Sequence, residues 1–100
     1  MRVKLLMQWD IEDGKESAYY DFIVNEFLPL AKRLGLDDIQ FWFTTYGNTE
    51  QIQASGITSN LDKMMRIING EEWDNLITRL TDLVSVYQQK VIPATNGFQL

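Results

Sequence analysis

Residues 1–10 read MRVKLLMQWD, and this stretch decides the fold because apolar and more polar residues alternate along it. The apolar residues at the odd positions are Val3, Leu5, Met7 and Trp9. Alternation with a period of two is the pattern of a strand with one buried face. We therefore expect a strand from Met1 to Asp10 whose odd residues face a layer of helices.

The other face of this strand is not simply a solvent face, since Leu6 lies between Lys4 and Gln8. A mixed surface of this kind favours a sheet face that is covered by something partly polar, either a partner subunit or a ligand cavity. The alternative is an amphipathic strand on a solvated sheet, because antiparallel sheets often leave one face in water.

The chain up to residue 57 predicts a helix and a hairpin. Apolar residues recur at three- and four-residue steps from Lys15 to Leu34, and Pro29 predicts a kink or a break in that helix. Gly35 suits the left-handed residue that ends it. Two strands follow, at residues 39–46 and 51–57, and their short connection predicts a hairpin. Gly56 indicates a close approach of another backbone, or a bulge.

The second half of the chain predicts two helices and a strand. Ser59 resembles the N-cap of a helix that ends at residues 69–70, and Glu71 opens another helix whose apolar spacing runs to Val84. A last strand is expected at residues 87–92, before Pro93, and residues 94–100 form a tail. This order predicts one α+β domain over residues 1–100, a ferredoxin-like βαββαβ sandwich with an antiparallel sheet and helices on one face.

Composition excludes several functions. The 100 residues include no cysteine and no histidine, which excludes thiolate chemistry and imidazole ligands, and we expect neither a metal nor a cofactor. The formal net charge of −5 argues against a nucleic-acid partner. No apolar run approaches the length of about 20 residues that crosses a membrane, and no secretory signal begins the sequence. We expect a cytoplasmic protein without a membrane partner.

Several segments together resemble the dimeric α/β-barrel superfamily, in which two ferredoxin-like sheets pair face to face. They are MRVKLLMQWDI with Gly14, the long helix with Pro29, FWFTTYG, and GEEW leading into YQQKVIP. The resemblance covers nearly the whole chain and is strongest to small uncharacterised members. It implies a homodimer.

The same resemblance implies a range of activities. The superfamily includes haem-degrading enzymes, cofactor-independent monooxygenases, isomerases of aromatic catabolism and proteins without known activity. Haem-degrading members use a histidine that this chain lacks, and cofactor-independent members use Asn, Trp and Tyr, whereas Gln8 stands here on the first strand. We therefore expect a protein that binds a small apolar or aromatic molecule between two sheets. The alternatives are a monooxygenase or isomerase acting on an aromatic or dicarbonyl substrate, and a structural dimer without a ligand.

The candidate site is the sheet face opposite the helices. Its candidate ligand-binding residues are Lys4, Gln8, Trp42, Thr44, Tyr46, Gln53 and Ser55, with Lys90 as a further candidate. Burial disfavours the charged form of an amine, so a buried Lys4 would serve as a base or react with a carbonyl. The alternative is that these side chains fill a dimer interface and pair with one another. Tyr19 and Tyr20 are interpreted as packing and surface residues.

Overall fold

The computed structural model describes residues 1–47 and 49–94, except for the side chains of residues 46, 49 and 50. Its elements are β1 (Val3–Ile11), α1 (Glu16–Phe22), the π-helix η1 (Ile23–Phe27), α2 (Leu28–Leu34), β2 (Asp37–Tyr46), β3 (Thr49–Thr58), α3 (Leu61–Ile68), α4 (Glu71–Thr81) and β4 (Val84–Pro93). The βαββαβ order predicted from the sequence is confirmed.

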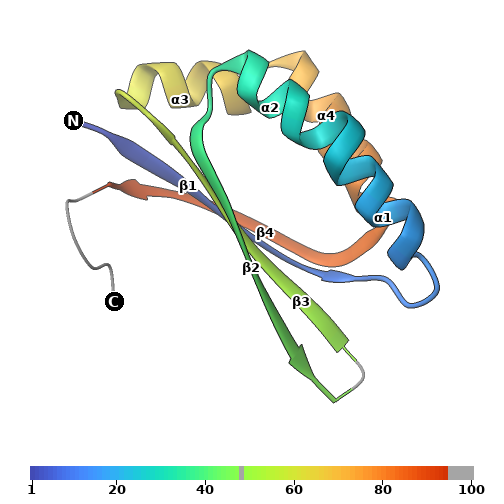
Figure 1. Ribbon diagram of the computed structural model, residues 1–100. Helices are drawn as coiled ribbons and strands as arrows, with labels where there is room; N and C mark the ends of the chain where they lie inside the picture. Colours follow the sequence, from blue (N-terminus) through green and yellow to red (C-terminus); the bar gives the residue numbers. More distant parts are fainter. Residues whose placement is uncertain (48, 95–100) are drawn as a thin grey trace.

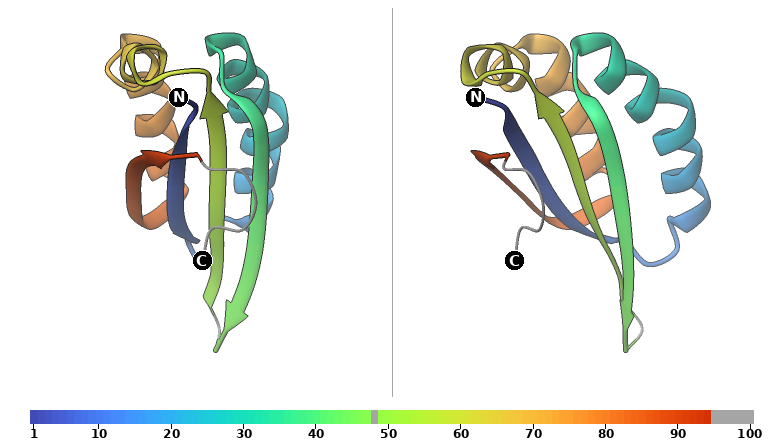
Figure 2. Two further views of the ribbon diagram at one scale, coloured as in Figure 1. Left: turned by 90° about the vertical axis from the view of Figure 1, so that its left-hand side faces the viewer. Right: turned by 60° about the vertical axis from the view of Figure 1, so that its left-hand side comes forward.

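One four-stranded sheet carries the fold, with the strand order β2-β3-β1-β4. All three neighbouring pairs are antiparallel, and β1 and β3 are the central strands, as the two crossovers predict. Figures 1 and 2 show the helices on one side of the sheet, while no helix covers the opposite side in the described part of the chain. The fold is α+β and ferredoxin-like.

The core lies between β1 and the helical layer. The odd residues of β1 are buried and the even residues are half-buried, as the alternation predicts. Trp9 is fully buried at the centre of an aromatic cluster: its ring meets Tyr19, Phe27 and Phe41 edge to face and stacks on Tyr87 at 5.9 Å between centroids. Its Nε1 donates a hydrogen bond of 3.0 Å to the Tyr19 hydroxyl. A single strand residue thus joins α1, η1, β2 and β4.

The first helix is interrupted before Pro29 by a turn of π-helix, where the Leu28 amide donates to the Ile23 carbonyl. Proline lacks an amide hydrogen and its ring crowds the preceding turn, so the wider turn accommodates it. The helix ends at Gly35, whose φ is 116°, and the Gly35 and Leu36 amides donate to the Lys32 and Ala31 carbonyls. This is a Schellman motif, which confirms the predicted end.

Gly56 in β3 packs against Leu36, the buried residue that follows this motif. A methyl group at Gly56 would lie 3.3 Å from the Leu36 Cβ, so the close approach is to a side chain, and the prediction of another backbone at Gly56 is wrong. The helix after β3 has Asn60 as its N-cap, since the Asn60 side chain accepts a hydrogen bond from the Lys63 amide at 2.8 Å. The prediction of Ser59 is wrong by one residue, because Asn60 is the residue whose side chain reaches that amide.

β4 begins earlier than predicted, and α4 ends earlier. The spacing of Leu80, Leu83 and Val84 continues the helical pattern, but α4 stops at Thr81 and Val84 pairs with Ile11 of β1. Val84 is buried in the core, so its apolar character suits either a further turn of α4 or the start of β4. The pairing between β1 and β4 then shifts between Gln8 and Asp10, and Val86 has a φ of 53° within this irregularity.

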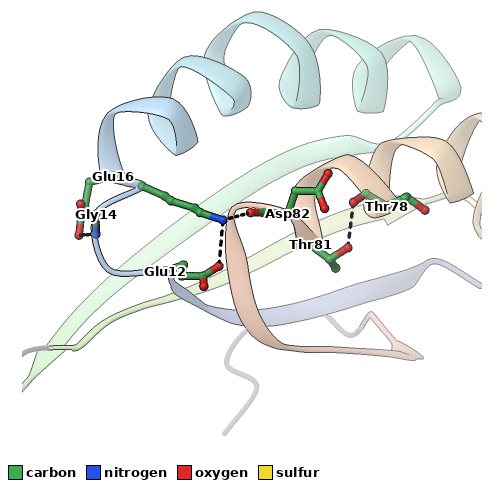
Figure 3. A network of polar contacts seen from close by, with 7 residues as sticks. Glu12, Gly14, Glu16, Thr78, Thr81 and Asp82 are labelled. Carbon is green, nitrogen blue, oxygen red and sulfur yellow. Dashed lines mark hydrogen bonds and ion pairs between the residues drawn. The ribbon is translucent and has the colours of Figure 1, made fainter.

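The turn after β1 is tied to the end of α4. Lys15 Nζ donates to the Asp82 carbonyl at 2.8 Å and lies 3.4 Å from Glu12 Oε2 (Figure 3). The Gly14 amide donates to Glu16 Oε2, and Gly14 has a φ of 84°. These contacts hold the turn in place at the edge of the helical layer, away from the middle of the uncovered sheet face.

Candidate functional site

The sheet face opposite the helices contains a cavity of about 310 Å³. Its lining residues come from all four strands: Leu6, Met7, Gln8, Trp42, Gln53, Ala54, Gln88, Gln89 and Lys90. Trp42 is 47% exposed, although tryptophan is a highly buried residue on average. The cavity therefore combines an accessible indole and an aliphatic floor with amide groups and one amine.

The strand register shows how these side chains are ordered across the sheet. Trp42 is paired with Gln53, Gln53 with Gln8, and Gln8 with Gln88. Paired residues in neighbouring strands present their side chains on the same face. This row therefore runs from the indole on β2 through three carboxamides to β4, and Gln53 Nε2 donates to Gln8 Oε1 at 3.3 Å.

A second row lies beside the first and carries the amine. Gln40 is paired with Ser55, Ser55 with Leu6, and Leu6 with Lys90. Ser55 is buried, being 2% exposed, and Leu6 is half-buried. Leu6 thus forms the apolar floor between the amine of Lys90 and the indole of Trp42.

Three of the candidate residues named from the sequence line this cavity, namely Gln8, Trp42 and Gln53, and Lys90 does so as well. Lys4 lies on the same face, half-buried and outside the lining. Of the further candidates, Thr44 is exposed on β2 and Ser55 is buried on β3. The Tyr46 side chain lies outside the described residues.

Gln88 was missed by the sequence reasoning. It alternates with Lys90 in β4, so the period of two already indicates that the two side chains share a face. The pattern does not give the partner residues on β1, because the irregularity between Gln8 and Asp10 changes which β4 residue lies opposite each β1 residue. The cavity is set by this register.

Charge is unevenly distributed over the face. Lys4 lies toward one end of β1, Lys90 lies on β4 opposite Leu6, and neither forms an ion pair within the described part of the chain. Asp10 lies at the other end and accepts a hydrogen bond from Gln51 Nε2 at 3.4 Å. Within residues 1–47 and 49–94, no group of three or more acidic side chains is close enough to hold a metal ion.

A second hollow lies on the helical side of the sheet. It measures about 340 Å³ and is lined by Tyr19, Tyr20, Ile23, Phe41, Trp42, Phe43 and Ile52. Burial raises the pKa of Tyr19, an effect that the hydrogen bond from Trp9 opposes, so its hydroxyl stays protonated at neutral pH. This hollow is more apolar than the cavity on the open face. It is open to solvent at Phe43, whose side chain is 53% exposed.

Comparison with known proteins supports the fold. No protein-family model matches the sequence, and no curated protein matches it. Solved structures do match. A NIPSNAP family protein from Agrobacterium tumefaciens has a TM-score of 0.68 at 20% identity, covering 95% of this chain and 87% of its own.

Two further structures extend this result. SnoaB, a cofactor-independent oxygenase from Streptomyces nogalater, has a TM-score of 0.75 at 10% identity, covering 96% of this chain and 95% of its own. An EthD family protein from Bacillus halodurans has a TM-score of 0.75 at 12% identity, covering 95% of this chain and 100% of its own. The chain has the fold of the dimeric α/β-barrel proteins. Among its described helices, none is long and apolar enough to cross a bilayer.

Proposed function

We propose that this protein forms a homodimer through its uncovered sheet face and holds a small apolar or aromatic molecule between the two sheets. The observation that supports the proposal is the cavity of about 310 Å³ on that face, with a half-exposed indole and a few polar groups. Small-molecule sites are typically hollows of a few hundred cubic ångströms that combine apolar walls with a small number of polar groups.

The charges on the face favour a second copy of the chain as the cover. Consider a two-fold axis that passes the middle of β1, perpendicular to the strand and parallel to the plane of the sheet. This axis places the two open faces against each other and reverses the strand direction in the second copy. Lys4 of one copy then lies toward Asp10 of the other, while Leu6 and its pairing partner Lys90 lie near the centre. The opposite charges of Lys4 and Asp10 would be brought together, which is the complementarity expected of a specific interface.

Native mass spectrometry tests both halves of this proposal, because it reports the number of subunits and any retained small molecule. Leu6→Glu places a charge at the centre of the interface, and Val24→Glu makes the same change on the exposed η1 surface of the helical layer. We expect a dimer for the wild type and for Val24→Glu, and a folded monomer for Leu6→Glu.

Added mass on the dimer would identify the bound molecule and is the expected result for protein purified without prolonged dialysis. A monomeric wild type would contradict the proposal, as would a Leu6→Glu variant that remains dimeric. A dimer that neither retains nor binds any small molecule would favour the third possibility, a structural dimer whose side chains fill the space between the sheets.

The second candidate function is a cofactor-independent monooxygenase or isomerase acting on an aromatic or dicarbonyl substrate. It is favoured by the shared fold with SnoaB and by the half-exposed indole of Trp42 in the open-face cavity. Oxygen uptake with a dihydroxynaphthalene tests it, using Lys4→Met and Tyr46→Phe as variants. Loss of turnover with retained binding supports the enzyme, and unchanged turnover in both variants contradicts the roles assigned to these residues.

A further inference from the structure

The lining of the open-face cavity carries a positive charge although the protein is acidic. Lys90 is the one charged residue among the described residues that line it, and no carboxylate does so. The whole chain has a formal net charge of −5. Lys90 forms no ion pair within the described chain, so its charge is available to another group. A cavity of this kind attracts an anion and disfavours a cation.

The indole and the amine stand at opposite sides of the cavity. Trp42 lies on β2 and Lys90 on β4, three strand spacings apart in the order β2-β3-β1-β4. Three spacings amount to roughly 14 Å between backbones. Both side chains are long and line the same cavity, so they shorten the gap that a ligand must bridge. A small rigid molecule with an aromatic ring at one end and a charge at the other matches this arrangement.

The groups between them suit the middle of such a molecule. Leu6 supplies an apolar floor next to Lys90, and the carboxamides of Gln8, Gln53 and Gln88 form the neighbouring row. The hydrogen bond from Gln53 to Gln8 uses one donor and one acceptor of the two side chains. A carboxamide has two N–H donors and an acceptor, so donors remain for the oxygens of an anion.

We infer that the cavity binds a planar aromatic carboxylate, with its ring against Trp42 and its carboxylate at Lys90. This inference rests on the proposed function, because it names the class of molecule held between the sheets. The contact between amine and carboxylate is a charge-assisted hydrogen bond, which is stronger than a neutral one. The ring contact supplies affinity for flat molecules of either charge state, and Lys90 supplies the preference for the anion.

Isothermal titration calorimetry with naphthoate and naphthamide tests the inference, because the two probes share a ring system and differ in charge. We expect the dimer to bind naphthoate about tenfold more tightly than naphthamide, as one charge-assisted hydrogen bond implies. Lys90→Gln should abolish this preference and Lys90→Arg should keep it. Lys32→Gln is the matched control, since it removes the same charge from the exposed surface of α2. Trp42→Leu should weaken the binding of both probes.

The outcomes separate this inference from the proposed function. Equal binding of the two probes, or a preference that survives in Lys90→Gln, overturns the assignment of an anion while leaving a small-molecule site in place. A Lys90→Gln variant that no longer forms a dimer shows that the partner subunit uses this charge, and it also overturns the assignment. Binding of neither probe to the wild-type dimer overturns the inference, whereas the small-molecule site itself is overturned only by a dimer that also retains no added mass in native mass spectrometry.

Discussion

Replacing Tyr19 with phenylalanine removes a polar contact at the centre of the aromatic core. The Trp9 Nε1 group donates to the Tyr19 hydroxyl at 3.0 Å, and both residues are buried, with exposed fractions of 0% and 1%. Phenylalanine keeps the ring and its edge-to-face packing on Trp9. The substitution therefore removes an acceptor and leaves a buried indole N–H without its partner.

The size of the effect follows from that burial. A buried donor left without its acceptor costs about 1–3 kcal/mol of stability. For a domain of this length, each kcal/mol lowers the melting temperature by roughly 4–8 °C. We expect Tyr19→Phe to unfold about 10 °C below the wild type, and about 2 kcal/mol less stably in urea.

Tyr87→Phe is the matched control for this measurement. The Tyr87 ring stacks on Trp9, but its hydroxyl donates to Gln89 Oε1 at 2.7 Å. The Gln89 side chain is exposed, so water can replace the donor that the substitution removes. This variant should lose less than about 0.5 kcal/mol. Urea unfolding followed by far-ultraviolet circular dichroism gives both values. If Tyr19→Phe is no more destabilised than Tyr87→Phe, the Trp9–Tyr19 hydrogen bond does not stabilise the core.

Three other predictions concern stability. Asn60→Ala should cost about 1 kcal/mol in thermal unfolding because it removes the N-cap of α3, whereas Ser59→Ala should cost almost nothing, and the reverse order would restore Ser59 as the cap. Gly56→Ala should cost about 1–3 kcal/mol in urea because the new methyl group lies 3.3 Å from both Cβ and Cδ1 of Leu36. Leu36→Ala removes Cδ1, so the double variant should lose less stability than the sum of the two single variants, and additive losses would contradict the importance of this contact. Burial raises the pKa of Tyr19 above the model-compound value of 10.0, so its contribution to stability is fully present below that pH and falls above it, where the unfolded chain loses this proton first. Urea unfolding at increasing alkaline pH should therefore show a steeper loss of stability for the wild type than for Tyr19→Phe, and identical slopes would contradict this assignment.

Local chemistry predicted much of the fold. The alternation in β1 indicated which of its residues are buried, and Gly35 marked the end of the first helix. The break in that helix was also expected from Pro29, although its form, a turn of π-helix before the proline, was not. These features depend on the residues themselves and their nearest neighbours along the chain, so the sequence is sufficient to indicate them.

Boundaries were less predictable where two structures suit the same residues. Val84 was interpreted as part of the last helix because its spacing from Leu80 is helical, yet it begins β4. An apolar side chain at this point reaches the core from either structure, and its pairing with Ile11 on a distant strand is favoured by tertiary contacts. The N-cap of α3 was ambiguous for the same reason, because Ser59 and Asn60 are both good caps and the backbone geometry selects between them.

For this protein, the sequence by itself determined the order of the elements, the buried face of each central strand and the mixed character of the opposite face, because these follow from periodicity and side-chain polarity. Only the tertiary structure decided which side chains meet in the cavity. Trp42, Gln8 and Gln88 are far apart in the chain, and their alignment in one row depends on strand order and on the register shift between β1 and β4. A shift of one residue moves a side chain to the other face of a sheet, so composition cannot specify such a row without the pairing.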